Sequence, residues 1–347
     1  MPFAQLIIGP PGSGKSTYCS GMQQFLSAIG RKTSVVNLDP ANDDLNYTCN
    51  LDIRDFITLE EVMEEHSLGP NGGVMFALEE VEHSIDQFIQ KVIDLGKHEY
   101  ILFDCPGQVE LFTHHSTLHK IFKRLEKLDY RLVVVHLIDS YYIKSPSQYI
   151  SILLLALRSM LLLDLPHINV LSKIDLLSNY GELDFNLDFY TEVHDLSHLF
   201  PLLQKESSSL LGQKYTKLSE AIADVVMDFS LVGFEVLAVE DKKSMINLLS
   251  VIDKANGYLF GSTEIGGDSV WADATRQGGY MGGIYDIQER WIDNKEAYDK
   301  QEREELEARI KEHNETQGIS DEKTSPEDEW EEALKNWEET QGGSYVR

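Results

Sequence analysis

Residues 9–16 read Gly-Pro-Pro-Gly-Ser-Gly-Lys-Ser, and this stretch decides the fold. It fits the pattern G-x-x-x-x-G-K-[ST], the phosphate-binding P-loop. A short, mostly apolar run of strand type, Ala4 to Ile8, precedes it, and Ser16 to Ile29 carries apolar residues at helical spacing. A strand, a glycine loop and a helix N-terminus surround an anion with backbone N–H groups and the positive end of the helix dipole. The sequence therefore predicts a phosphate site.

Two residue types in this motif have defined chemical tasks. Lys15 is expected to reach the β and γ phosphates of a nucleotide, and the Ser16 hydroxyl is expected to ligate Mg²⁺. The other nucleotide contacts of the loop are expected from Gly12, Ser13, Gly14 and Thr17. The cofactors implied are a nucleotide and Mg²⁺.

Composition restricts the class of protein. The formal net charge of −28 over 347 residues argues against direct nucleic-acid binding and against an anionic membrane surface. The three cysteines are scattered without metal-ligand spacing, which fits a reducing compartment. The segment from Ile150 to Leu165 is too short for a membrane span and contains Arg158 and Asp164, so we expect a largely buried helix. We expect no signal peptide, since the chain enters a strand at once.

An aspartate follows the second expected strand, Thr33 to Asn37. Pro40 cannot continue a helix, which puts Asp39 at the carboxyl end of that strand, where open parallel sheets place their ligands. Asp39 is therefore a candidate to orient a water molecule or to serve the metal. Aspartate before proline is also ordinary turn chemistry, and the residues alone leave both interpretations open.

The third expected strand, Tyr100 to Phe103, runs into the sequence Asp-Cys-Pro-Gly-Gln at residues 104–108. An aspartate at the end of an apolar strand downstream of a P-loop is typical of the residue that holds Mg²⁺ through a bound water, which assigns this role to Asp104. The N–H of Gly107 is expected to sense a γ-phosphate. Gln108 and Glu110 are expected to orient an attacking water.

The fifth expected strand, His167 to Leu171, ends in Ser172-Lys173-Ile174-Asp175. This stretch is similar to the guanine-reading motif N/T-K-x-D. The Asp175 carboxylate can accept hydrogen bonds from guanine N1–H and N2–H₂, a pair of donors that adenine lacks, and the Lys173 stem can cover the base. Ser172 departs from the usual Asn or Thr, so one orienting hydrogen bond is weakened or replaced. GTP and GDP are therefore the expected nucleotides.

Six expected strands, each followed by a helical segment, predict an α/β fold with a doubly wound, mostly parallel six-stranded sheet. The strands are expected at 4–8, 33–37, 100–103, 132–138, 167–171 and 234–239. Backbone amides after the last strand, with Ala238 among them, are expected at the edge of the base. The fold class is thus a P-loop nucleotide-binding domain with the motif order of a G-domain.

The domain organisation follows from composition. Residues 1–260 are expected to form the nucleotide-binding domain, with a helical insertion at about 179–215. Residues 261–347 are expected to form a Gly-rich linker and an acidic tail, with 20 acidic and 9 basic residues between 286 and 347. We expect the tail to be disordered or only partly helical. Docking to a partner and a solubilising role both remain open for it.

Taken together, the motifs resemble those of the GPN-loop GTPases over about residues 3 to 260. The motifs that carry the resemblance are residues 9–16, Asn37-Leu38-Asp39-Pro40-Ala41, Gly69-Pro70-Asn71, residues 104–111 and residues 172–175. The acidic tail lies outside the resemblance. The resemblance implies Mg²⁺-dependent hydrolysis of GTP to GDP and phosphate.

The resemblance also implies partners and roles that spacing does not. Members of this family form homodimers, or heterodimers with their paralogues, that face each other across the nucleotides. The Gly69-Pro70-Asn71 loop would then project into the partner's site and bring Asn71 near the γ-phosphate. Asp39 and Gln108 become the water-positioning pair, with Glu110 a possible helper. The family is linked to RNA polymerase II assembly and nuclear import, acting in the cytoplasm with shuttling to the nucleus.

Two other classes of function stay open at this point. A P-loop ATPase or kinase would transfer phosphate to an acceptor, and a basic acceptor pocket would support it. A nucleotide-binding scaffold would bind clients with little turnover, although Lys15, Asp104 and Gln108 argue against an inactive site.

Overall fold

The computed structural model describes residues 2–43, 45–95, 99–193, 195–206, 210–258 and 284–317. The chain divides into two compact units, Met1–Asp293 and Asn294–Arg347. The linker expected at 261–283 and the tail beyond residue 317 lie outside the described residues.

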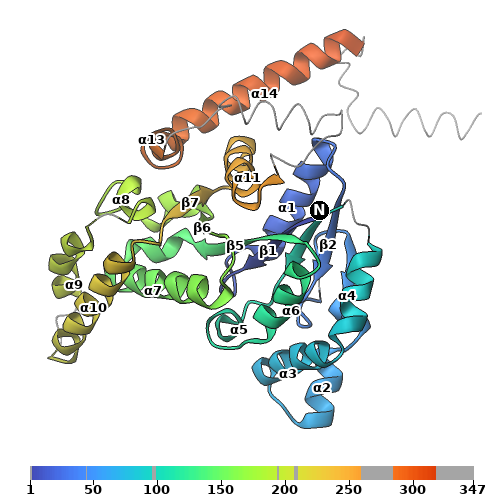
Figure 1. The fold of residues 1–347 in the computed structure, drawn as a ribbon. Coiled ribbons are helices and arrows are strands. Elements are labelled where there is room, and N and C mark those ends of the chain that lie inside the picture. The colour runs from blue at the N-terminus through green and yellow to red at the C-terminus, as the bar shows by residue number, and fades with distance from the viewer. Residues whose placement is uncertain are drawn as a thin grey trace, which may run out of the picture. The chain divides into compact units, whose positions relative to one another are not determined.

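The first unit is built on a parallel sheet in the order β3-β2-β4-β1-β5-β6-β7. Figure 1 labels β2, β1, β5, β6 and β7 of this sheet. The strands are β1 (Phe3–Ile8), β2 (Thr33–Asn37), β3 (Cys49–Asp52), β4 (Tyr100–Asp104), β5 (Arg131–Asp139), β6 (His167–Ser172) and β7 (Phe234–Leu237). All six strand pairs are parallel. The carboxyl ends of the strands therefore meet at one edge, where the order reverses around β1. This edge is where an open sheet places its ligand.

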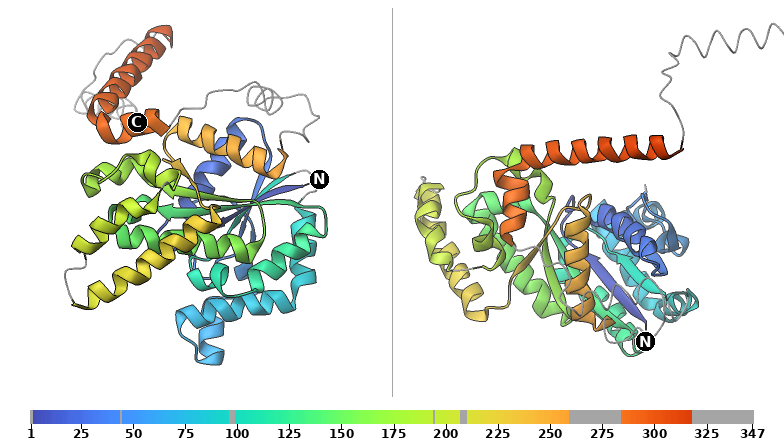
Figure 2. Two further views of the ribbon diagram at one scale, coloured as in Figure 1. Left: turned by 60° about the vertical axis from the view of Figure 1, so that its left-hand side comes forward. Right: turned by 90° about the horizontal axis from the view of Figure 1, so that it is seen from above.

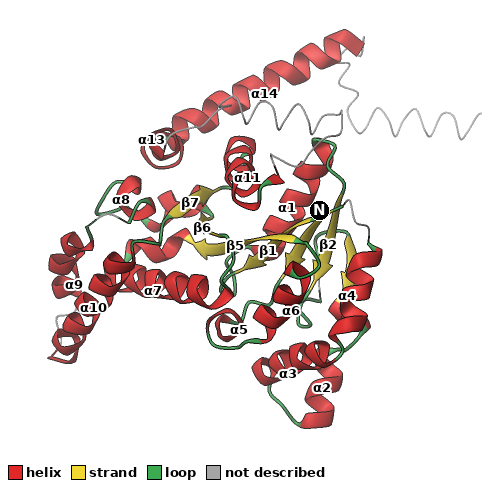
Figure 3. Cartoon of the chain, viewed as in Figure 1, coloured by secondary structure: helices red, strands yellow, loops and turns green. Residues whose placement is uncertain are grey.

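Helices and short helical turns connect the strands (Figure 3). The helices of the first unit are α1 (Lys15–Ala28), α2 (Leu59–His66), α3 (Pro70–His83), α4 (Ile85–Asp94), α5 (Val109–Thr113), α6 (Thr117–Glu126), α7 (Pro146–Leu163), α8 (Leu187–Thr191), α9 (Phe200–Glu206), α10 (Leu210–Phe229), α11 (Lys242–Asn256) and α13 (Ile284–Gln288). The helical turns are η1 (Ile53–Asp55), η2 (Ser140–Lys144), η3 (Ile174–Tyr180), η4 (Leu196–Leu199) and η6 (Glu289–Asp293).

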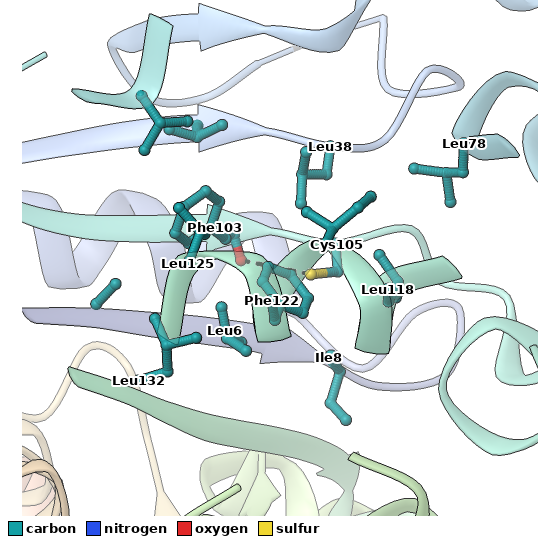
Figure 4. Close-up of a cluster of buried hydrophobic side chains, with 14 of the residues drawn as sticks. Leu6, Ile8, Leu38, Leu78, Phe103, Cys105, Leu118, Phe122, Leu125 and Leu132 are labelled. Carbon is teal, nitrogen blue, oxygen red and sulfur yellow. Dashed lines mark hydrogen bonds between the residues drawn. The ribbon is translucent and has the colours of Figure 1, made fainter. Parts of the chain in front are cut away.

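Alternation along the strands divides the core between the two faces of the sheet. Leu6 and Ile8 of β1 pack with α6 and α3 (Figure 4), whereas Ile7 packs with α1 and α11. The two views of Figure 2 show helices on both sides of the sheet. A third cluster joins α7, α8 and α10 to the ends of β5, β6 and β7. Burial on both faces explains why the strands read as near-continuous apolar runs.

The structure has seven strands in the sheet where the sequence predicted six. The additional strand is β3, which pairs with β2 at the edge of the sheet. Its sequence, Cys-Asn-Leu-Asp, buries only Leu51. A four-residue edge strand needs no apolar run, because only one of its edges is paired, and this is why its sequence gave no strand signal.

The Gly69-Pro70-Asn71 stretch, which the resemblance implies is a loop, instead leads into helix α3, whose first two residues are Pro70 and Asn71. Pro70 occupies the first position of α3. Proline is favoured there because a backbone N–H at this position would have no partner within the helix, and proline lacks that group. A Cβ at Gly73 would lie 2.7 Å from Leu59 Cδ1, so this glycine serves the close packing of α2 and α3. Helices α3 and α4 are separated at Ser84, whose φ and ψ angles are −99° and 24°.

Helix α7 is the apolar segment that was expected to be a buried helix. It is long and apolar enough to cross a membrane, with a mean hydropathy of 1.4. Half of this helix, however, is buried inside the protein. Leu153 and Leu157 face the core. A helix in the core of a protein can have the same length and hydropathy, so these two properties of α7 are weak evidence for a membrane span.

The end of the first unit lies beyond residue 260. Trp291 of η6 packs into the cluster of α7, α8 and α10 with 9% of its surface exposed, and Gln288 accepts a hydrogen bond from the Leu187 backbone at 3.1 Å. The second unit, described by itself, contains α14 (Lys295–Gln317). In this helix Lys300 Nζ lies 3.8 Å from Glu304 Oε1. Such an i,i+4 ion pair is typical of a solvated helix.

Candidate functional site

The loop between β1 and α1 holds the phosphate-binding motif in a conformation that requires glycine. Gly9, Gly12 and Gly14 have φ angles of 151°, 76° and 90°, which residues with a Cβ rarely adopt. A Cβ at Gly9 would lie 2.2 Å from the carbonyl oxygen of Leu137. The loop therefore packs directly against β5 and leads straight into the N-terminus of α1, whose first N–H groups have no partner within the helix.

Lys15 is the first residue of α1, and its side chain turns back onto the loop. Its Nζ donates a hydrogen bond to the carbonyl oxygen of Pro10 at 3.2 Å. Burial lowers the pKa of this ammonium group, whereas the negative charges of Asp104 and Asp39 act in the opposite direction. The structure thus brings together the lysine and the two carboxylates that the sequence singled out on three different elements.

Asp104 ends β4 between two other strands, opposite Ile7 of β1 and Asn37 of β2. Its Oδ2 accepts hydrogen bonds from the Ser16 hydroxyl at 2.8 Å and from the Tyr47 hydroxyl at 2.9 Å. Its Oδ1 is buried and has no hydrogen-bond partner among the described residues. Burial raises the pKa of this carboxyl, and the two hydroxyl donors and Lys15 lower it.

Asp39 follows β2, and its backbone is bracketed by one side chain. The amide of Asn37 accepts from the Asp39 N–H and donates to the Asp39 carbonyl oxygen, each at 3.1 Å. The Asp39 carboxylate accepts from the Ala41 N–H at 3.0 Å. Burial raises the pKa of this carboxyl, while the hydrogen bond from Ala41 and the charge of Lys15 lower it. The carboxylate therefore has both the turn chemistry and the site position that the sequence left open.

The glycine of the D-x-x-G stretch touches the phosphate loop. A Cβ at Gly107 would lie 2.9 Å from Lys15 Nζ and 3.2 Å from Pro11 Cα, so a side chain there would displace Lys15 and press on the loop. The next residue, Gln108, precedes α5. Its Nε2 lies 3.5 Å from Asn71 Oδ1 of the same chain, the long limit of a hydrogen bond. Sequence reasoning did not place these two side chains together.

Five further residues expected at the site are exposed. Gly69, Pro70 and Asn71 form the exposed start of α3, with Gly69 as the residue before the helix. Glu110 lies in the first turn of α5 with an exposed side chain. Thr17 is exposed in the first turn of α1.

The end of β6 is hydrogen-bonded to the phosphate loop. The Ser172 hydroxyl lies 2.8 Å from the Ser13 carbonyl oxygen and 3.1 Å from that of Ile138, and it can donate to either. Lys173 adopts a left-handed backbone conformation, with φ 58°. Its stem passes over the loop, since a Cβ at Gly14 would lie 3.9 Å from its Cε. Serine here supplies a hydroxyl donor at the position where the motif usually has Asn or Thr.

Two further expected base contacts have different outcomes. Asp175 lies half-buried in the first turn of η3, directly after Lys173 and Ile174. Ala238 uses its N–H to donate to the Ser244 hydroxyl at 3.0 Å, and its carbonyl oxygen accepts from Asp241 at 3.1 Å. Both backbone groups of Ala238 are therefore engaged, which argues against the predicted base contact by this amide.

Sequence reasoning missed three residues near the site. Tyr47 donates to Asp104, and Asn42 donates from Nδ2 to the Ser16 hydroxyl at 3.2 Å. Asp139 accepts a hydrogen bond from Lys173 Nζ at 2.8 Å. Asp139 ends a predicted strand, as Asp104 does, and that position was an available signal. Tyr47 and Asn42 lie in an irregular loop, where no spacing marks them.

This arrangement defines a class of protein. A glycine loop at a helix N-terminus, an aspartate at the end of the neighbouring strand and a K-x-D turn bonded to the loop are the features of a P-loop nucleotide-binding protein with G-domain order.

Comparisons with known proteins give the family. A family model described as "Conserved hypothetical ATP binding protein" matches residues 7–258. The chain is 63% identical to GPN-loop GTPase 2 of Saccharomyces cerevisiae over 350 residues, which covers 100% of both chains. It is 54% identical to GPN-loop GTPase 2 of Schizosaccharomyces pombe over 87% of this chain and 95% of the relative.

A solved structure supports the same conclusion. A GTPase in apo form from Pyrococcus abyssi matches 73% of this chain and 97% of its own, with a TM-score of 0.58 and 26% identity. The chain belongs to the GPN-loop GTPase family.

Proposed function

We propose that this chain binds GTP at the β1–α1 loop and hydrolyses it to GDP and phosphate. The observation that carries the proposal is the hydrogen bond between the Ser172 hydroxyl and the Ser13 carbonyl oxygen. It joins the strand end that would read guanine to the loop that would hold the phosphates. Lys173 and Asp175 contact the base in this proposal, and Gly12, Gly14 and Lys15 contact the phosphates.

The donor set fits a Mg²⁺ ion. Mg²⁺ prefers oxygen ligands and binds through one or two carboxylates, substrate phosphates and water. The Ser16 hydroxyl and the Asp104 carboxylate are hydrogen-bonded to each other, and Asp104 Oδ1 is buried without a partner among the described residues. Ser16 and Asp104, with Asp39 nearby, would hold the ion, which would neutralise charge on the phosphate oxygens.

The residues of the chain would then orient water for attack in line with the γ-phosphate. Gln108 is the first candidate, because its Oε1 is buried and has no hydrogen-bond partner among the described residues. Asp39 is the second, since its half-buried side chain lies near Lys15. Asn71 contacts Gln108 and is proposed to act beside the γ-phosphate. Glu110 is a helper at most, because its side chain is exposed.

The test of the proposal is equilibrium binding of fluorescent GDP and ADP, with Lys15→Ala as the control, followed by phosphate release from GTP. Tight GDP binding with ADP at least about a hundredfold weaker is expected, because two hydrogen bonds to a charged carboxylate are lost with adenine. Equal affinities would instead favour an ATPase or kinase; the matching family model is described as an ATP binding protein. Binding without phosphate release would favour a scaffold.

We also propose that the chain works as a dimer, with itself or a paralogue. The exposed position of Gly69, Pro70 and Asn71 at the start of α3 supports this, because these residues are accessible to a partner. A mixing experiment separates action within one chain from action across a dimer. Lys15→Ala chains and Asn71→Ala chains, each inactive alone, should regain phosphate release when mixed if Asn71 acts on the partner's nucleotide. No recovery would place Asn71 in its own site.

A role in assembly and nuclear import of RNA polymerase II is the cellular part of the proposal, in the cytoplasm with shuttling to the nucleus. The three free cysteines are compatible with that compartment. Exposed apolar side chains at helical spacing on α10, Tyr215, Leu218, Val225 and Phe229, are available to a protein partner. Binding of purified polymerase subunits should weaken in Leu218→Glu/Val225→Glu and persist in the charge control Lys217→Glu.

A further inference from the structure

The loop between β2 and β3 carries Tyr47 in a position fixed from both sides. The Ser20 hydroxyl of α1 donates to the Asn46 carbonyl oxygen at 2.9 Å. Gln23, one turn further along α1, accepts from the Thr48 N–H at 3.1 Å and donates to the Thr48 carbonyl oxygen at 2.9 Å. The two neighbours of Tyr47 are thus fastened to the helix that follows the phosphate loop.

The Tyr47 side chain runs inward from this loop to the site. It is 8% exposed, and its hydroxyl donates to Asp104 Oδ2 at 2.9 Å. A carboxylate can only accept hydrogen bonds, and a hydrogen bond to a charged acceptor is among the stronger ones. The contact therefore restrains Asp104 rather than merely filling space around it.

The second donor to the same oxygen makes the restraint selective. The Ser16 hydroxyl also donates to Asp104 Oδ2, at 2.8 Å. Two donors on one oxygen of a planar group limit rotation of the carboxylate. They leave Oδ1 as the buried oxygen without a partner among the described residues. Rotation of the carboxylate away from this orientation would break both bonds.

We propose that Tyr47 is a positioning residue that holds the Asp104 carboxylate with Oδ1 available, and so sets how strongly Mg²⁺ enhances nucleotide binding. The inference rests on the proposed function, since it concerns the same site. It assigns to α1 a second task, because Ser20 and Gln23 fix the loop from which Tyr47 reaches Asp104.

The test is the affinity of the full chain for fluorescent GDP, measured in Mg²⁺ and in EDTA. Tyr47→Phe removes only the hydroxyl and keeps the ring in place. Its affinity in EDTA should stay within about twofold of the natural chain, and the enhancement by Mg²⁺ should fall about tenfold, as expected for the loss of one charge-assisted hydrogen bond. Gln23→Ala frees the loop without changing the Tyr47 ring. This variant should also lower the enhancement of GDP affinity by Mg²⁺.

The matched control is Tyr149→Phe. The Tyr149 hydroxyl is also buried and donates to the Tyr190 carbonyl oxygen at 2.8 Å, in the cluster between α7 and α8. This variant should keep the full Mg²⁺ enhancement. Thermal melting of all variants without nucleotide shows that each is folded before binding is measured.

The outcomes separate the two proposals. Full Mg²⁺ enhancement in Tyr47→Phe, or an equal loss of affinity in Mg²⁺ and in EDTA, would overturn the role of Tyr47 and leave the proposed function intact. Failure of the natural chain to bind GDP at all would overturn the proposed function, and this inference with it.

Discussion

The side-chain amide of Gln108 lies 3.5 Å from the side-chain oxygen of Asn71 in the same chain. The two residues come from different parts of the sequence, the start of α3 and the residue before α5. Their contact links the Gly-Pro-Asn stretch to the D-x-x-G stretch. A ligand that moves one of these segments therefore also acts on the other through this contact.

Replacement of Gln108 by leucine is predicted to separate binding from turnover. The leucine side chain has similar bulk but cannot hydrogen-bond to water. GTP affinity should stay unchanged, and phosphate release in single-turnover experiments should slow by at least about tenfold. Unchanged turnover would remove Gln108 from the mechanism.

Ser172→Ala is predicted to weaken binding without changing its selectivity. The substitution leaves the carbonyl oxygens of Ser13 and Ile138 without their hydroxyl donor and loosens the link between β6 and the phosphate loop. The affinity for GDP should fall about fivefold, equivalent to one neutral hydrogen bond of about 1 kcal/mol. Ser172→Thr keeps the hydroxyl and should bind as the natural chain does. An equal loss in both variants would argue against the hydroxyl.

Asp175→Ala is predicted to abolish base selectivity. The two hydrogen bonds from guanine to the carboxylate would be lost, so the affinity for GDP should fall by at least about a hundredfold. The affinity for ADP should change little. Titration with both fluorescent nucleotides measures the ratio directly, and a retained preference for GDP would show that another group reads the base.

Acidification is predicted to destabilise the chain through two histidines that have buried ring nitrogens. Burial lowers the pKa of His136 to about 4 and also lowers that of His167, whose ring lies 5.6 Å away. Such a group contributes stability above its unfolded pKa of about 6.5, and this is lost as pH falls toward the folded value. The free energy of unfolding should drop by about 2 kcal/mol for His136 between pH 7 and pH 5.

Urea unfolding at the two pH values measures this loss, and His136→Gln isolates it from other groups. The variant should show a shallower dependence on pH than the natural chain. Parallel profiles would mean that His136 does not take up a proton on unfolding in this range.

The ion pair between Arg31 and Asp253 is predicted to be costly to break. Asp253 is fully buried in α11, Arg31 is 4% exposed, and their two hydrogen bonds measure 3.0 and 2.8 Å. Arg31→Leu removes the cation and both of these hydrogen bonds from a buried carboxylate and should lower the free energy of unfolding by about 3–5 kcal/mol. The double variant Arg31→Leu/Asp253→Leu removes that charge and should lose clearly less. Chemical unfolding curves decide between additive and compensating effects.

The sequence predicted the sheet class and the positions of Lys15 and Asp104, because apolar runs that end in charged or glycine residues mark buried parallel strands. It did not predict β3, whose four residues bury only Leu51. Short edge strands are specified by pairing with their neighbour, and no pattern within the strand records this.

The site residues show the same division between those that local sequence predicts and those that tertiary packing determines. Residues in motifs were placed by local spacing, whereas Tyr47 reaches Asp104 because Ser20 and Gln23 fasten its loop to α1. The contact between Asn71 and Gln108 depends on where α3 begins. Contacts that rest on tertiary packing leave no trace in a linear spacing, and the engaged N–H of Ala238 shows the same limit.

The central place of β1 also bears on synthesis of the chain. In the sheet, Ala4 of β1 lies opposite Ile101 of β4, and Phe3 of β1 lies opposite Arg131 of β5. A nascent chain therefore presents its phosphate loop long before either neighbouring strand has left the ribosome. Closing such distant pairs makes parallel sheets slow to form. A chain that ends before Arg131 would leave the β5-facing edge of β1 unpaired and exposed to other chains.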